Sequence, residues 1–305
     1  MGSGVWSRDR FADYSRSMGR NVNASGAVSG DYRAQEMFRS RSLDSALNAY
    51  GKVRECRDSE EHPATIPVIL ALDVTGSMGQ AAVEVAKKLN VVMTELFDKT
   101  KDVEFLIMGI GDLAYDRAPI QASQFESDIR IAEQLDKVYF EFGGGGNGYE
   151  SYTAAWYFAL RHTSLDCLER GQKGLIITMG DEALNPYLPG NALCRTLGGG
   201  VESDIETPSL YKEVIEKFDV YHLAVIDRLS SGQRYKEQIM RTFGELLGER
   251  LRIVDIGSIA GEIVNIVTSF AERDNPVGIS PAYTEPVKKT VGEKIKETAG
   301  KLISW

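Results

Sequence analysis

Three oxygen-bearing side chains follow one apolar stretch of the chain at alternate positions. Residues 66–72 form an unbroken apolar run, and Asp73, Thr75 and Ser77 come soon after it. Side chains at positions i, i+2 and i+4 of a tight turn can converge on one point. One carboxylate and two hydroxyls suit a hard divalent cation, whereas zinc would require histidine or cysteine. The spacing therefore predicts a site for Mg²⁺ (or Mn²⁺) at this turn.

The segments around the turn indicate where it lies in the fold. The apolar run has the length of a strand that is buried on both faces. Residues 81–97 repeat apolar side chains with the period of a helix. In an open α/β sheet, ligands bind at the carboxyl ends of the strands, which is where this turn would lie. The alternative is that the polar residues only cap the following helix.

Apolar strands alternate with helical segments along the rest of the central region. Strands are predicted at 66–74, 103–109, 174–179, 220–226 and 251–256. A helix is predicted at 125–135, and an edge strand near Tyr139. This alternation predicts an α/β fold with a doubly wound, mostly parallel sheet and helices on both faces.

Composition divides the chain into three parts. Residues 1–64 are rich in Ser, Gly and Arg, and they are predicted to be a partly irregular N-terminal arm. The arm either packs along the domain through its aromatic residues or stays disordered until it binds. Residues 65–274 are the predicted α/β domain. Residues 275–305 are predicted to be a proline-punctuated linker followed by an amphipathic C-terminal helix, which docks on its own domain, on a partner or on a membrane surface.

Charge and cysteine content exclude several classes of protein. The net charge of −9 argues against a nucleic-acid partner. Three widely spaced cysteines argue against a disulfide scaffold or a zinc module and favour a reducing compartment. We find no apolar run near the roughly 20 residues that span a bilayer and no signal peptide core. We therefore expect a soluble, cytoplasmic protein for which membrane binding is disfavoured.

The six residues 73–78, DVTGSM, resemble a known family motif. They are similar to the Asp-x-Ser-x-Ser motif of von Willebrand factor A (vWA) domains, in its Asp-x-Thr-Gly-Ser variant. In that family the motif forms the metal-ion-dependent adhesion site (MIDAS). The resemblance extends over residues 66–273 and implies a Rossmann-like vWA fold. It also implies that Thr75 and Ser77 bind Mg²⁺ directly, and that Asp73 and Asp181 bind it directly or through water.

The second metal-binding loop of the family has no clear match. Its usual Gly-Gly-x-Thr turn is replaced here by GGGGNGYESYTAAW at 143–156. Thr153 falls inside a predicted helix, too late to reach the metal, whereas Asn147, Glu150 and Ser151 lie nearer the loop. We predict Glu150 as the metal ligand and keep the other two as alternatives. The competing interpretation is that Glu150 is a first-turn acid favoured by the helix dipole.

These observations together predict a non-enzymatic, divalent-metal-dependent protein-binding domain that acts as an intracellular adaptor or assembly subunit. Coordination rich in hydroxyls leaves a cation under-neutralised, so an Asp or Glu of a protein partner can complete its shell. Intracellular members of the family commonly serve ATPase chaperones and larger assemblies. The resemblance therefore implies a partner of that kind.

A haloacid-dehalogenase-like phosphotransferase is the alternative function. Its first strand would end in Asp73 as the nucleophile, and Asp181 would bind Mg²⁺. Three features oppose it. Thr75 stands where these phosphatases use an aspartic general acid, Asn185 replaces the last acid of a later motif, and Gln80 leads directly into a helix with no room for a cap insertion.

Overall fold

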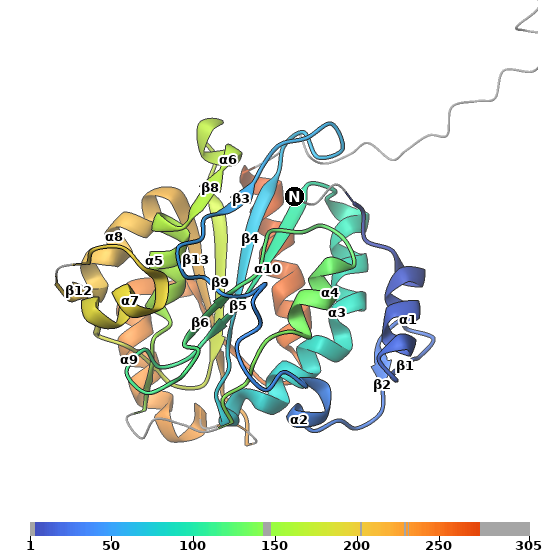
Figure 1. Cartoon of the computed structure of the whole chain (residues 1–305), viewed down its shortest axis with the longest axis horizontal. Helices are drawn as coiled ribbons and strands as arrows, with labels where there is room; N and C mark the ends of the chain where they lie inside the picture. Colours follow the sequence, from blue (N-terminus) through green and yellow to red (C-terminus); the bar gives the residue numbers. More distant parts are fainter. Residues whose placement is uncertain (1–3, 143–147, 202, 229, 231, 275–305) are drawn as a thin grey trace, which may run out of the picture.

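A computed structural model describes residues 4–142, 148–201, 203–228, 230 and 232–274 (Figure 1). Its central element is a six-stranded sheet. The strand order is β14 (Leu251–Val254), β13 (Phe218–Val225), β9 (Gly174–Gly180), β4 (Ile66–Asp73), β5 (Val103–Ile110) and β6 (Ile120–Ala122). Neighbouring strands are parallel except for β5 and β6, which are antiparallel.

Strand β4 lies inside the sheet, and its apolar side chains fill the cores on both faces. All eight of its residues are buried. Val68 and Leu70 belong to one core, whereas Ile69 and Ala71 belong to the other. The first core is covered by α3 (Gly79–Lys99) and α10 (Ile259–Asp274), and the second by α5 (Thr153–Arg161), α8 (Thr207–Lys217) and α9 (Gly232–Leu247) (Figure 1).

The predicted fold class, a doubly wound and mostly parallel Rossmann-like sheet, is wrong because the sheet is mixed and smaller sheets accompany it. Directly after β5 the chain reverses through residues 111–119, and β6 pairs with β5 in the antiparallel direction. The apolar pattern missed this reversal because β6 has only three residues. The described residues also form four two-stranded sheets. These pair β1 (Asn21–Val22) with β2 (Val28–Ser29), β3 (Arg54–Cys56) with β8 (Thr163–Leu165), β7 (Tyr149–Glu150) with β10 (Ala183–Leu184), and β11 (Tyr187–Leu188) with β12 (Ile205–Glu206).

The remaining helices are short, and two predicted elements differ from the structure. The helix predicted at 125–135 is reduced to its last six residues, and residues 139–142 form no strand. The short elements are α1 (Arg8–Ser17), α2 (Ala34–Met37), η1 (Gly76–Met78), α4 (Arg130–Leu135), α6 (Asp166–Glu169), α7 (Gly190–Leu197) and η2 (Gly248–Arg250).

The N-terminal segment packs against the domain over its described residues. Figure 1 shows α1, β1 and β2 beside α3. Trp6 and Phe11 belong to the same core cluster as that helix. The indole Nε1 of Trp6 donates to Asn90 Oδ1 at 2.9 Å, and Asn90 Nδ2 donates to the Gly26 carbonyl at 2.9 Å. Of the two alternatives for the arm, the described residues adopt the packed one.

The linker and the C-terminal helix predicted at 275–305 lie outside the described residues, so both stay predictions. Within the residues that the structure describes, no helix is long and apolar enough to cross a membrane.

A buried ion pair attaches this N-terminal segment to the domain. Arg20 Nη1 lies 2.8 Å from Asp136 Oδ2, and the two side chains are only 6% and 8% exposed. The Tyr14 hydroxyl donates to the same carboxylate oxygen at 2.8 Å. Arg20 Nη2 also donates to the Met37 carbonyl at 2.8 Å. Removal of the guanidinium would therefore leave a buried carboxylate without its counter-charge.

We expect Arg20→Ala to lower the free energy of unfolding by about 3–5 kcal/mol, because one partner of a buried pair is lost. Urea unfolding of the full chain measures the change. Arg16→Ala is the matched control, because its pair with Asp13 is exposed and should contribute less than about 1 kcal/mol. Equal losses of unfolding free energy in the two variants would show that burial does not increase the contribution of the Arg20 pair to stability.

Candidate metal centre

Asp73 ends the central strand with its carboxylate buried. Its side chain is enclosed, and the residue is only 1% exposed. Oδ1 accepts hydrogen bonds from the Thr75 backbone N–H at 2.9 Å and from Thr75 Oγ1 at 2.5 Å. Oδ2 accepts from the Tyr152 hydroxyl at 2.8 Å. Both carboxylate oxygens are thus held by fixed donors that replace the water lost on burial.

The structure brings together the four residues predicted from the turn and from the loop after β9. Ser77 Oγ lies 3.3 Å from Thr75 Oγ1 and donates to Asp181 Oδ1 at 3.0 Å. Asp181 directly follows β9 and is fully buried. Because β4 and β9 are parallel neighbours, their carboxyl ends deliver Asp73 and Asp181 to one edge of the sheet. Metal binding by this cluster stays a prediction.

Glu150 lies in a strand ahead of the helix and is outside the first helical turn. It is part of β7, pairs with Leu184 of β10, and is 2% exposed. Its Oε2 has no hydrogen-bond partner in the described part of the chain. Burial, with the nearby charge of Asp73, raises the pKa of the Glu150 carboxyl to about 11. The side chain is a buried carboxylic acid that a cation would convert to the charged form.

The other candidates from the second loop are engaged elsewhere or not described. The Ser151 hydroxyl accepts a hydrogen bond from the Leu113 N–H at 3.1 Å. Thr153 Oγ1 accepts from Asn185 Nδ2 at 2.6 Å. Both hydroxyls therefore hold neighbouring segments of the chain together. Asn147 lies outside the described residues.

Tyr152 is the site residue that sequence reasoning missed. It is fully buried, and its hydroxyl contacts Asp73, although the two residues are 79 positions apart in the sequence. Its oxygen also accepts from the Glu182 N–H at 3.3 Å. Gly180 makes room for it, because a Cβ at that position would lie 1.9 Å from the Tyr152 oxygen. No local pattern could reveal this contact, although a glycine directly before Asp181 is compatible with a close approach.

Buried carboxylates dominate the electrostatics of the site. Burial, and then the charge of Asp181, raises the pKa of Asp73 to about 8. Burial, again followed by Asp181, raises the pKa of Glu182 to about 7. These acids repel one another when charged, and a cation placed between them would relieve that repulsion. Their oxygen atoms are the ligand type that Mg²⁺ and Mn²⁺ prefer.

The nearest histidine contributes packing to this region. His222 stacks on Phe243 with ring centroids 3.7 Å apart and meets the Tyr152 ring edge-on at 4.9 Å. Its Nδ1 lies 2.8 Å from Thr178 Oγ1. Burial lowers the pKa of the imidazole to about 3, so the ring is neutral at physiological pH. His222 therefore supports Tyr152 as a neutral, packed ring.

The described residues hold no cluster of three or more His, Cys, Asp or Glu side chains that could bind a metal by itself. The arrangement around Asp73 has two carboxylates and two hydroxyls instead. A cation here would need further oxygen ligands from water, from Glu150 or from a partner.

Comparison with known proteins gives no family. No family model matches the chain, and no curated protein matches it. Among solved structures, the open form of the pilus adhesin SpaC from Lactobacillus rhamnosus GG shares 14% identity at a TM-score of 0.44, covering 72% of this chain and 31% of that chain. Proximal thread matrix protein 1 from the mussel byssus shares 14% identity at a TM-score of 0.41, covering 68% and 46%. The chain thus spans less than half of either structure.

The identification as a vWA domain with a MIDAS is wrong on these findings. No family model supports it, and the described residues contain no group of three or more acids, histidines or cysteines that could hold a metal. At these TM-scores the likenesses carry no argument about function. The motif misled because its short spacing also suits a local turn, in which Asp73 Oδ1 accepts from the N–H and the hydroxyl of Thr75.

We expect Gly180→Ala to lower the free energy of unfolding by about 1–3 kcal/mol, because the added methyl overlaps the Tyr152 ring and forces it away from Asp73. Chemical denaturation measures the loss, and tyrosine absorbance reports the displaced ring. Gly244→Ala is the control, since nothing lies within 4 Å of the added carbon and its helical position favours alanine. Unchanged stability of Gly180→Ala would contradict the packing described above.

Proposed function

We propose that this chain is a non-enzymatic protein-binding domain whose contact with its partner depends on a divalent cation, Mg²⁺ or Mn²⁺, bound at Asp73, Thr75, Ser77 and Asp181. One observation carries the proposal: two buried carboxylates from adjacent strands are joined through two hydroxyls at the carboxyl edge of the sheet. An all-oxygen set of this kind fits a hard cation.

Each residue has a distinct part in this proposal. Tyr152 and the Thr75 N–H hold the Asp73 carboxylate in one orientation. Ser77 links that turn to Asp181. The bound cation would supply positive charge for an incoming ligand. Because two of the four protein ligands are neutral hydroxyls, an Asp or Glu from a partner can join the shell. Glu150 stays the predicted fifth ligand, and its charge would weaken that capture.

The contacts around Asp73 support binding over phosphoryl transfer. Thr75 stands where these phosphatases use an aspartic general acid, and its hydroxyl donates to Asp73 Oδ1, so that acid is missing here. Asn185, which stands at the last position of the phosphotransferase motif, uses its amide to hold Thr153 and the Tyr187 carbonyl. Its contacts are therefore those of a structural residue.

The predicted setting is the cytoplasm, and the predicted role is that of an adaptor or assembly subunit. All three cysteines are free thiols, which supports a reducing compartment. The net charge of −9 favours a protein partner over nucleic acid. An ATPase chaperone or a multi-subunit assembly stays the predicted kind of partner, and its Asp or Glu is the group expected to reach the cation.

We expect 10 mM Mg²⁺ to stabilise the full chain by about 1.4 kcal/mol if the dissociation constant is about 1 mM, because the cation binds only the folded state. Asp73→Asn should abolish this effect, because it removes the carboxylate that the cation binds. Thermal unfolding with and without Mg²⁺ measures both results.

Asp13→Asn is the matched control, because it changes a carboxylate that is 74% exposed and should keep the Mg²⁺ effect. An unchanged Mg²⁺ effect in Asp73→Asn would refute the site. Formation of an acyl-phosphate on Asp73 after incubation with acetyl phosphate, seen by mass spectrometry of the intact protein, would refute the non-enzymatic function.

A further inference from the structure

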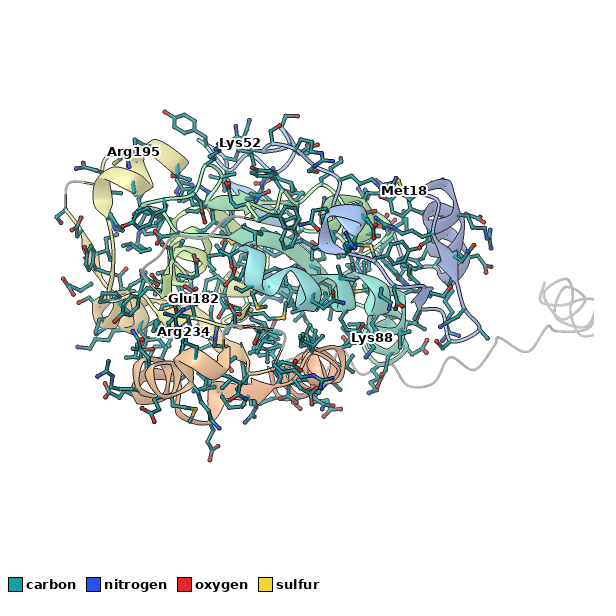
Figure 2. The ribbon with its side chains drawn as sticks, turned by 90° about the horizontal axis from the view of Figure 1, so that it is seen from below. Met18, Lys52, Lys88, Glu182, Arg195 and Arg234 are labelled. Carbon is teal, nitrogen blue, oxygen red and sulfur yellow. The ribbon has the colours of Figure 1, made fainter. Side chains whose placement is uncertain are left out.

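A buried histidine contacts the N-terminal segment at the amino edge of the sheet. His62 lies in the loop that leads into β4 and is 1% exposed. The candidate metal centre is at the opposite edge, because Asp73 ends the same strand. In Figure 2 the helix α1, which ends just before the labelled Met18, lies next to α3, which carries the labelled Lys88. His62 is thus placed to hold the segment that packs beside α3.

Two side chains of the domain contact one carbonyl of that segment. His62 Nε2 lies 3.2 Å from the Gly4 carbonyl oxygen, and the Ser127 hydroxyl donates to the same oxygen at 2.6 Å. His62 Nε2 and Ser127 Oγ are themselves 3.2 Å apart. The backbone can approach this closely because Gly4 has no side chain, since a Cβ at that position would overlap the Asp128 carboxylate. The Gly4 carbonyl is therefore held at a fixed place against the domain.

The other ring nitrogen of His62 faces acidic groups. Its Nδ1 lies 3.5 Å from Asp102 Oδ1. Glu104 of β5 is a second acid near the ring, and burial raises the pKa of its carboxyl to about 7. The interaction with the Asp102 carboxylate, opposed by burial of the ring, raises the pKa of His62 above its ordinary value. These two acids therefore favour the charged imidazolium.

The other charged groups beside the contact are paired with one another. Glu126 and Asp128, on either side of Ser127, both form ion pairs with Arg130. Asp102 and Glu104 are therefore the carboxylates that control the charge of His62.

The protonation state of His62 decides which hydrogen bonds the Gly4 carbonyl receives. In the imidazolium both ring nitrogens donate, so Nε2–H points at Gly4 while Nδ1–H faces Asp102. In the neutral ring the Asp102 carboxylate favours the proton on Nδ1, and the bare Nε2 becomes an acceptor. The bare nitrogen repels the carbonyl oxygen and competes with it for the Ser127 proton. Loss of one proton thus removes the donors that hold Gly4.

We propose that His62 is a pH-sensitive latch, which holds the N-terminal segment against the domain while its imidazole is protonated and releases the segment at Gly4 when the proton is lost. This contact is separate from the proposed metal dependence. Because the pKa of His62 is raised in the folded state, the stabilisation is fully present below the ordinary pKa of about 6.5 and is lost as the pH rises through the folded-state pKa.

The first test is an NMR titration of the full chain that follows the histidine ring protons. The chain has three histidines, and burial lowers the pKa of both His162 and His222. His62 should therefore be the one histidine with a midpoint above about 6.5. Asp102→Asn should lower that midpoint by about one unit, because it removes the negative charge beside the imidazolium. A wild-type midpoint at or below the ordinary value, or an unchanged midpoint in Asp102→Asn, would overturn the latch.

The second test is hydrogen exchange of the Trp6 indole N–H, which donates to Asn90. Trp6 is two residues after Gly4, so release of Gly4 should let the indole open more often. Well below the His62 midpoint, His62→Phe should exchange roughly tenfold faster than the wild type, because a hydrogen bond from a charged group is lost. Well above the midpoint, where the wild-type ring is neutral, the two proteins should differ by less than about twofold. Comparison at one pH cancels the pH dependence of the exchange chemistry.

His162→Phe is the matched control, because this half-buried ring follows α5 and its Nδ1 contacts the Lys52 carbonyl instead of Gly4. It should change the indole exchange less than about twofold at both pH values. An effect of His62→Phe that is equal at both pH values would show that the ring only packs, and would overturn the latch, as would no effect at either pH. If His62→Phe does not fold, the titrations of the wild type and of Asp102→Asn decide the question.

Discussion

Burial of the Asp73 carboxylate is the constraint on which the rest of the site depends. The strand that ends in Asp73 is apolar on both faces, and its last side chain is buried as well. A buried carboxylate is costly unless fixed donors replace its hydration. Here the donors are the Thr75 N–H and hydroxyl and the Tyr152 hydroxyl. The position of Tyr152 in turn requires the absence of a side chain at Gly180.

The layers of the fold maintain this arrangement from both sides. On one face, α3 begins at the turn itself, and the N-terminal segment covers this helix. Trp6 of that segment donates a hydrogen bond to Asn90 of α3. On the other face, Tyr152 packs against His222 and Phe243, and burial keeps the imidazole neutral. The turn is therefore held between two cores, and its polar atoms have little freedom to rearrange.

Buried carboxylates set the charge in the interior of the site. The carboxylates of Asp73, Glu150 and Asp181 are buried close to one another, which raises the pKa values of Asp73 and Glu150. Charged carboxylates this close together repel one another, and a bound cation would relieve that repulsion. The proposed metal dependence follows from this distribution.

The amino-acid sequence by itself determined the local features. Its apolar runs placed the buried strands β4, β5, β9 and β13, and the short spacing of Asp73, Thr75 and Ser77 determined their convergence in one turn. Packing between distant segments decided the antiparallel β6, the role of Tyr152 and the placement of Glu150 in a strand pair. Family membership could not be read from six residues, because a local turn accounts for the same pattern. The physical reason is separation along the chain. Backbone geometry fixes the relative positions of residues that are neighbours in the sequence, whereas contacts between residues far apart in the sequence form only when the layers pack.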